Sequence, residues 1–252
     1  MPQLKDIIAW LDDKLHAAQA RDVAANGLQV EGRSEVKHIV TAVSANLELL
    51  QQAQRRGADL VIAHHGLVWG GIQKISGPLR QRLALLLGHE LSLAAYHLPL
   101  DMHAEYGNNA GLARLFSLQN VQPFGEYRGQ QIGFMGQLPQ PVSLDDFVQK
   151  VRRDIHPNPL ILDAGGGKML RKIALCSGGA AELLDEAIAA DCDLYLTGES
   201  TEYWPALVRE SGVHAIAAGH HATERFGVRS LVPLLAEKFD CKVEFIDVDN
   251  PL

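Results

Sequence analysis

Short, continuously apolar runs alternate along this chain with amphipathic stretches of helical period. The clearest run covers residues 60–63, and similar runs cover residues 38–43 and 91–96. A strand that is apolar on consecutive residues is buried on both faces, as in a sheet covered by helices. The pattern therefore predicts an α/β fold with largely parallel or mixed sheets.

The amphipathic stretches between these runs predict the covering helices. Apolar positions recur at helical spacing over residues 4–17 and 47–56, and Gly57 is suited to end the second helix. Ser143 is a suitable N-cap for a further helix, and Asn108 or Asn109 for another. Other helices are expected over residues 80–88, 110–116 and 228–239.

The second half of the chain repeats the pattern of the first at an offset of 134 residues. Asp193-Leu194 corresponds to Asp59-Leu60, and Thr197-Gly198-Glu199 stands where Ala63-His64-His65 stands in the first copy. A later strand in each half ends in histidine, at His97 and at His220. The sequence therefore predicts two similar α/β units from an internal duplication, residues 1–122 and 123–252, with the C-terminal segment able to pack back on the first.

Composition narrows the class of protein. The chain of 252 residues has 47% hydrophobic residues, 21% charged residues and a formal net charge of -7, without a basic cluster. A surface for binding nucleic-acid backbones is therefore not expected. The cysteines are Cys176, Cys192 and Cys241, without C-x-x-C spacing, which argues against disulfides or a thiolate zinc site. With no signal peptide and no membrane-length apolar run, we expect a cytoplasmic protein.

Histidines and carboxylates gather after the expected strands, at the edge where α/β sheets bind ligands. They are His64, His65, His97 and Asp101 in the first half, and Glu199, His220, His221 and Glu224 in the second. A lone histidine at a strand end is usually structural, but this collection predicts a metal site in a cleft between the two units. Histidine and carboxylate without thiolate suit zinc, iron(II), manganese or cobalt.

Several motifs resemble the NIF-three-like dinuclear metal family, also called the GTP cyclohydrolase I type 2 homologue family, in its bacterial YbgI branch. They are His64-His65-Gly66, residues 97–101, Gly107-Asn108-Asn109, Thr197-Gly198-Glu199 and residues 219–224, with further matches at 26–32 and 245–247. The resemblance implies two divalent metal ions per subunit and a toroidal homohexamer. The ligands that it implies are His64, His65, Asp101, His220 and Glu224, with Glu224 bridging the ions.

Other polar residues beside these ligands are candidates for supporting roles. His97 and Glu199 are the predicted catalytic residues, because each could orient a ligand or move a proton. His221 is a further candidate, and His103 lies two residues past Asp101. The alternative for each is a buried, hydrogen-bonded structural residue.

Two functions fit this site. The first is a metal-dependent hydrolase in which a metal-bridging hydroxide attacks a nucleotide or a related small molecule. The family name suggests GTP ring opening, and a dinuclear site could equally cleave a phosphoester. The second is a non-enzymatic, ring-shaped metal-binding scaffold or regulatory protein.

Three other motifs do not support a chemistry of their own. Residues 165–167 are three glycines that run into a strand, so a hairpin-type turn is expected there, not a phosphate loop. No serine near a strand end has the G-x-S-x-G pattern of a hydrolase nucleophile. Cys176 has no cation placed to lower the pKa of its thiol.

Overall fold

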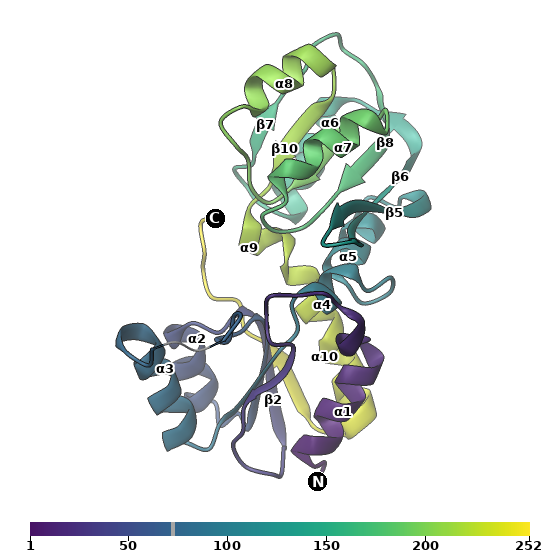
Figure 1. The fold of residues 1–252 in the computed structure, drawn as a ribbon. Helices are drawn as coiled ribbons and strands as arrows, with labels where there is room; N and C mark the ends of the chain where they lie inside the picture. The colour runs from purple at the N-terminus through teal and green to yellow at the C-terminus, as the bar shows by residue number, and fades with distance from the viewer. Residues whose placement is uncertain (72–73) are drawn as a thin grey trace. The chain divides into compact units, whose positions relative to one another are not determined.

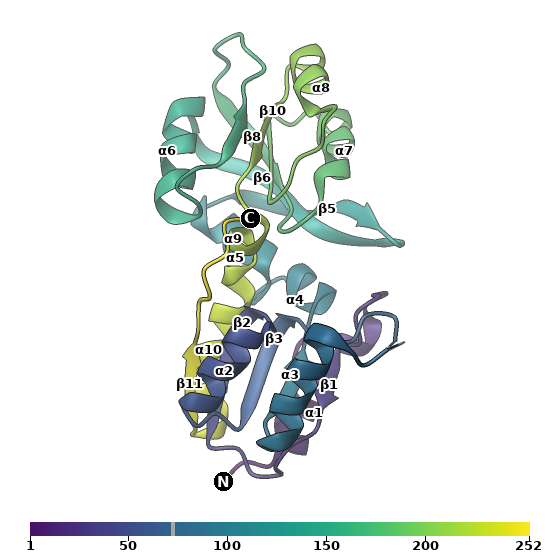
Figure 2. The same cartoon turned by 90° about the vertical axis from the view of Figure 1, so that its left-hand side faces the viewer.

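The computed structural model describes residues 1–71 and 74–252 and contains two compact units. The first unit comprises residues 1–107 and 227–249, and the second comprises residues 108–226 and 250–252. Each unit is a sheet with helices on both faces (Figures 1 and 2). The predicted α/β class with mixed, helix-covered sheets is confirmed.

The sheet of the first unit has five strands in the order β1-β4-β3-β2-β11. They are β1 (Gly27–Val30), β4 (Ser92–Ala95), β3 (Leu60–His65), β2 (His38–Ser44) and β11 (Lys242–Phe245). β4, β3, β2 and β11 run parallel, and β1 is antiparallel to β4 at one edge. The carboxyl ends of the parallel strands therefore share one edge of the sheet.

Four helices cover the two faces of this sheet: α1 (Leu4–Lys14), α10 (Arg225–Phe239), α2 (Leu47–Arg55) and α3 (Gly77–Gly88). Ile39 and Leu60 pack on the side of α1 and α10, whereas their neighbours Val40 and Val61 pack on the side of α2 and α3. Figure 1 shows the two helical layers on either side of β2. Burial of consecutive side chains on opposite faces explains why these strands are apolar throughout.

The sheet of the second unit has six strands in the order β5-β6-β8-β9-β10-β7. They are β5 (Gln119–Tyr127), β6 (Gln130–Val142), β8 (Leu170–Leu175), β9 (Leu194–Thr197), β10 (His214–Ala217) and β7 (Leu160–Leu162). β8, β9 and β10 are parallel, and the other pairings are antiparallel.

Helices also cover both faces of this second sheet. The covering helices are α5 (Asn108–Leu115), α6 (Leu144–Asp154), α7 (Leu184–Ala189) and α8 (Trp204–Ser211). Ile173 faces α5 and α6, while Ala174 faces α7 and α8. The shorter helices of the chain are α4 (Leu98–Met102), α9 (His220–Thr223), η1 (Ala17–Gln19) and η2 (Ala181–Leu183).

The predicted repeat is visible in strand order and in hydrogen bonding. An antiparallel edge strand precedes three parallel strands in both sheets, β1-β4-β3-β2 in one and β7-β10-β9-β8 in the other. The Oδ2 atom of Asp59 accepts the backbone N–H groups of residues 37 and 38, at 2.8 and 3.1 Å. Asp193 accepts those of residues 171 and 172, both at 2.8 Å. The aspartates and their donors are each 134 positions apart, as expected for a duplicated unit.

The bounds of the compact units differ from the predicted domains, residues 1–122 and 123–252. α5 belongs to the second unit, because Leu112 and Phe116 pack in the core formed with α6. Residues 227–249 belong to the first unit, where Leu231 and Leu235 pack against the sheet.

Several local predictions needed correction. The strand predicted to end at Ala63 continues through His65, because His65 pairs with Ser44 in β2. Asn108 and Asn109 are the first residues of α5 and are buried, so neither is its cap. The turn at residues 165–167 does not form a hairpin, because β7 pairs with β10 while β8 pairs with β6 and β9.

Other local predictions agree with the structure. Ser143 caps α6 by accepting the N–H of Asp146 at 3.1 Å. None of the three cysteines, all of which the structure describes, forms a disulfide, and Cys176 and Cys192 are buried. Among the described residues, no helix is long and apolar enough to cross a membrane.

Candidate metal centre

His64 stands at the end of β3 with one ring nitrogen already engaged. The residue is fully buried, and its Nδ1 lies 3.0 Å from the carbonyl oxygen of Tyr96. Because a carbonyl only accepts, Nδ1 carries the hydrogen and the lone pair is on Nε2. That Nε2 lies 3.5 Å from Oδ2 of Asp101, a buried residue of α4. Two of the predicted ligands therefore face each other within the first unit.

His65 follows on the same strand and is half-buried. Its Nδ1 lies 3.1 Å from the hydroxyl oxygen of Ser44 in β2. The next residue must be small, since a Cβ atom at Gly66 would stand 2.6 Å from the Cβ of Ala95 and would also overlap the side chain of Gln29. The Gln29 Oε1 atom instead accepts the backbone N–H groups of residues 67 and 68, at 2.7 and 3.1 Å, and so fixes the loop after the histidines.

His97, after β4, is held by Asp22, a residue that the sequence reasoning missed. The His97 Nδ1 lies 3.0 and 3.1 Å from the two carboxylate oxygens of Asp22. Asp22 also accepts hydrogen bonds from Ala24 N, Asn26 Nδ2 and Leu98 N. Burial by itself raises the pKa of Asp22, but the hydrogen bonds and charge of His97, with the bonds from Ala24 and Asn26, bring that pKa well below its usual range. The carboxyl group is therefore ionised at neutral pH.

The three rings of the first unit form one cluster. The ring centroid of His64 lies 4.6 Å from that of His65 and 5.1 Å from that of His97, and His65 and His97 are 5.7 Å apart. One ring nitrogen from each residue lies within 4.8 Å of the other two. The exposed indole of Trp69 stands edge-on to His97, with centroids 4.9 Å apart.

The second unit places His220 between two carboxylates. Its Nδ1 lies 2.6 Å from Oε1 of Glu199, which follows β9, and its Nε2 lies 3.1 Å from Oε1 of Glu224. Burial by itself lowers the pKa of His220, but hydrogen bonds and charges of Glu224 and Glu199 raise this pKa to about 9. Glu224 is buried, whereas Glu199 is exposed.

Two glycines, Gly178 and Gly198, lie very close to His220 and Glu224. The sequence pattern did not predict these contacts. Gly178 has a φ of +71°, and a Cβ atom there would overlap Oε1 of Glu224 and stand 3.3 Å from Nε2 of His220. Its N–H donates to the hydroxyl of Thr223 at 3.0 Å. A Cβ atom at Gly198 would stand 2.6 Å from Cα of His220. The available signal was the pair Gly178-Gly179 after β8, at the ligand edge of the sheet.

All four of these histidines share one arrangement: an oxygen contacts Nδ1. The oxygens belong to Tyr96, Ser44, Asp22 and Glu199. Metal-binding histidines commonly donate one ring N–H to a carboxylate or carbonyl and coordinate through the other nitrogen. The residues present in each unit thus fit a divalent cation. The candidate ligands are His64, His65 and Asp101 in the first unit, and His220 and Glu224 in the second.

Other candidate residues have different surroundings. His221 lies next to His220 on α9, and its backbone N–H donates to the carbonyl of Leu252 at 3.0 Å. His103 contacts α1, with its Nε2 at 3.0 Å from the carbonyl oxygen of Lys14, and its Nδ1 accepts backbone N–H groups of residues 105 and 106. Burial lowers the pKa of His103. Its hydrogen bonds give it a structural role.

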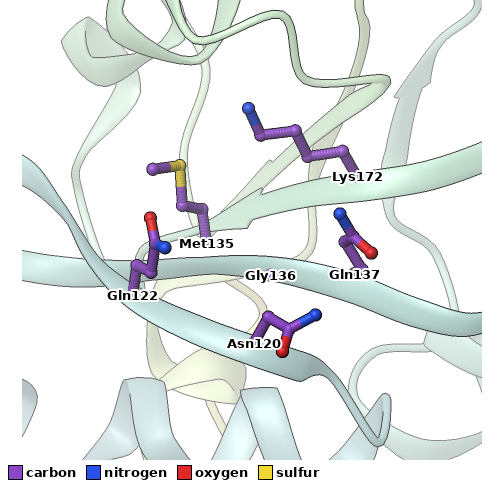
Figure 3. A pocket seen from close by; sticks show the side chains of 6 residues that line it. All are labelled: Asn120, Gln122, Met135, Gly136, Gln137 and Lys172. Carbon is purple, nitrogen blue, oxygen red and sulfur yellow. The ribbon is translucent and has the colours of Figure 1, made fainter.

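The second unit also contains an open cavity of about 190 Å³. It is lined by Asn120, Gln122, Met135, Gly136, Gln137 and Lys172, which come from β5, β6 and β8 (Figure 3). None of these side chains is a histidine, cysteine or carboxylate. The cavity therefore offers none of the expected metal ligands.

Comparison with known proteins gives matches over nearly the whole chain. The sequence pattern of the Duf34/NIF3 family (NGG1p interacting factor 3) matches residues 2–251. A protein of Pseudomonas aeruginosa named GTP cyclohydrolase 1 type 2 homolog is 43% identical over 249 residues, which make up 98% of each chain. A protein of the same name from Haemophilus influenzae is 40% identical over 242 residues, 96% of each chain.

Solved structures are similar over the same length. A structure described as protein ybgI, of unknown function, has a TM-score of 0.93 at 39% identity and covers 99% of this chain and 100% of that one. A protein of Thermus thermophilus gives a TM-score of 0.88 at 33% identity, with coverage of 99% and 100%. HcgD from Methanocaldococcus jannaschii gives 0.85 at 25% identity, with 98% of both chains covered.

Proposed function

Since this chain belongs to the Duf34/NIF3 family, we propose that it is a hydrolase in which two divalent metal ions act on a nucleotide or a related small molecule. The family resemblance inferred from the motifs, including the bacterial YbgI branch, is confirmed. The observation that supports the proposal most is the oxygen in contact with Nδ1 of each histidine, because metal-binding histidines commonly donate one ring N–H and coordinate through the other nitrogen.

The proposed ligands are His64, His65, Asp101, His220 and Glu224. Two divalent ions carry four positive charges, and the carboxylates of Asp101 and Glu224 return two negative ones. The remaining charge favours an anionic substrate such as a phosphate. Glu224 is the proposed bridging ligand, because a carboxylate has two oxygens to share. The metals are zinc, iron or manganese, which this donor set does not distinguish.

Each supporting residue has a separate task in this proposal. When bound, the ions supply Lewis-acid chemistry and lower the pKa of water. Glu199 holds the His220 ring by its Nδ1 atom, 2.6 Å away, and so fixes where Nε2 points. His97 is positioned to hold or transfer a proton through Nε2, with Asp22 holding its Nδ1.

The relatives' name suggests a guanine nucleotide as substrate and GTP ring opening as the reaction. Cleavage of a phosphoester uses the same metal chemistry and is the other reaction in the proposal. A homohexamer and a cytoplasmic location are also part of it. Light scattering of the purified chain tests the hexamer, and a mass of one or two chains would contradict it.

A nucleotide panel with metal-reconstituted protein tests the hydrolase. We expect turnover that requires metal and is abolished in His65→Ala and Asp101→Asn. The matched controls His89→Ala and Asp13→Asn change exposed residues and should leave it intact. Saturable metal binding without turnover of any nucleotide would favour the alternative, a metal-binding scaffold or regulatory protein.

A further inference from the structure

Trp69 lies beside the candidate metal centre of the first unit and is exposed. Of the chain's three tryptophans, all of which the structure describes, Trp204 is fully buried and Trp10 is partly buried, whereas Trp69 is 40% exposed. We propose that the indole of Trp69 is a stacking platform for the base of a nucleotide substrate. The inference rests on the proposed function and adds to it the residue that binds the base.

Trp69 follows β3 by four residues, at the ligand edge of the sheet. Its ring centroid lies 4.9 Å from that of His97 and 5.9 Å from that of His65. The indole plane is inclined by 74° to the His97 ring and by 46° to the His65 ring, so neither histidine is stacked flat on it. The exposed part of the indole is therefore accessible to a flat ring at the rim of the histidine cluster.

The backbone of Trp69 is held in place by the segment before β1. Residue 69 forms an antiparallel β-bridge with Ala24. The N–H of residue 25 donates to the carbonyl of residue 68 at 3.0 Å, and the N–H of residue 70 donates to the carbonyl of residue 23 at 2.7 Å. A platform whose backbone is fixed before the ligand arrives loses little conformational entropy on binding, which favours affinity.

The polar group of the indole is engaged within its own loop. Nε1 donates its hydrogen to the carbonyl oxygen of Gly66 at 3.2 Å. The indole therefore offers a ligand its π surface, not a donor that reads the edge of a base. Every base has a π face, so stacking of this kind tolerates different bases. We expect Trp69 to supply affinity for the base without selecting which base binds.

Calorimetric titration of the zinc-reconstituted full chain tests the platform. The probes are GMP, AMP and ribose 5-phosphate, which carries a sugar phosphate without a base. Trp69→Ala should weaken the binding of both nucleotides by about 5- to 150-fold, the equivalent of about 1–3 kcal/mol for one base–aromatic stack. The affinities for ribose 5-phosphate and for zinc should not change. Trp69→Phe keeps an aromatic face and should lose less affinity.

Leu87→Ala is the matched control. It removes another exposed apolar side chain, at the end of α3 that leads into β4 and so opposite the carboxyl ends of the strands. Its affinities for all three probes should equal those of the wild type. Circular dichroism and thermal unfolding establish that each variant is folded.

Fluorine NMR of protein labelled with 5-fluorotryptophan gives a direct readout. The three tryptophans give three signals, and Trp69→Phe identifies the signal of Trp69. GMP should shift this signal and leave the other two in place, because Trp10 packs against Phe239 and Trp204 is buried with its Nε1 donating to Ala181. If Trp69→Ala does not fold, the shift in the wild-type protein decides.

The outcomes separate this inference from the proposed function. Equal nucleotide affinities in wild type and Trp69→Ala, or an unshifted Trp69 signal in nucleotide-saturated protein, would overturn the inference, and turnover by that protein would leave the hydrolase standing. An equal loss of affinity for ribose 5-phosphate in Trp69→Ala would also overturn it, since Trp69 would then support the site and not the base. Binding of GMP that depends on Trp69, without turnover of any nucleotide, would support the inference and contradict the hydrolase. Wild-type protein that binds no nucleotide would contradict both.

Discussion

The Oδ1 atom of Asp22 lies 3.0 Å from Nδ1 of His97, although 75 residues separate the two in the chain. The same carboxylate accepts the backbone N–H groups of residues 24 and 98. It thereby joins the segment before β1 to the start of α4 and orients a ring of the candidate metal centre. One buried side chain thus fixes two backbone segments and the orientation of the His97 ring.

Asp22→Ala should destabilise the protein because it leaves several buried donors without an acceptor. We expect a loss of about 2–4 kcal/mol in the free energy of unfolding, since each orphaned donor costs about 1–3 kcal/mol and water replaces part of the loss. Urea unfolding measures it, with Asp13→Ala as a control at an exposed aspartate. A change below about 0.5 kcal/mol, the range of ordinary surface substitutions, would show that Asp22 does not organise this segment.

Asp193 should make the stability depend on pH in the acid range. Burial by itself raises the pKa of Asp193, but Lys168 and the N–H groups of residues 172 and 171 lower it overall. A folded pKa below the unfolded value gives stability that is present above the unfolded pKa, about 3.9, and is lost as the pH falls through the folded pKa.

Urea unfolding of wild type and Asp193→Asn between pH 7 and pH 2 measures this contribution. The difference in stability between the two proteins should shrink as the pH falls below about 4. A difference that stays constant over this range would mean that Asp193 contributes no ionisation-linked stability.

Gly178→Ala should disturb the pair formed by His220 and Glu224. The new Cβ would overlap Oε1 of Glu224, in addition to the strain of a φ of +71°. Gly57 is a matched control, because its φ is +72° and nothing lies within 4 Å of a Cβ there. Both variants carry a backbone cost of about 1–3 kcal/mol.

Only Gly178→Ala should also weaken metal binding. Calorimetric titration with zinc measures the affinity of both variants. Equal affinities in Gly178→Ala and Gly57→Ala would show that the close contact between Gly178 and Glu224 is not needed to position the Glu224 carboxylate for metal binding.

Removal of metal should lower the thermal stability. An ion that binds only the folded state adds about 2.7 kcal/mol at a free concentration of 100 times Kd. The melting temperature should therefore fall after chelation and recover on adding zinc. Asp101→Asn should reduce this difference, while Asp13→Asn should leave it unchanged. A melting temperature that does not respond to chelator in metal-loaded protein would argue against metal bound to the native state.

The sequence predicted the parallel strands well because burial on both faces requires apolar residues at every position. Ile39 and Val40 illustrate this, since they face opposite helical layers. The antiparallel strand β5 was missed because its first five residues are exposed and carry no apolar pattern. Pairing with β6, not the burial of its own side chains, places β5 in the sheet.

The candidate site was predictable where a strand delivers its residues, as at His64, His65 and Glu199. Asp22 was not, because nothing in its local sequence indicates a bond to His97, 75 positions away. The need for glycine at position 178 could not be predicted either, because it comes from the close contact with Glu224, 46 positions away, and not from a neighbour in the sequence. Contacts between distant segments leave no periodic signal in a single sequence.

The offset of 134 residues has a consequence for how this site can change. A protein assembled from two identical copies of one such unit would carry the same side chain at both equivalent positions. Within one chain the copies mutate independently, so position 65 holds a histidine proposed to bind metal while position 199 holds a glutamate that orients another histidine. Asp59 and Asp193, which each accept two backbone N–H groups, are the same residue in both copies. A repeated frame within one chain therefore lets the candidate ligand positions differ between the copies while the residues that hold the strands stay the same.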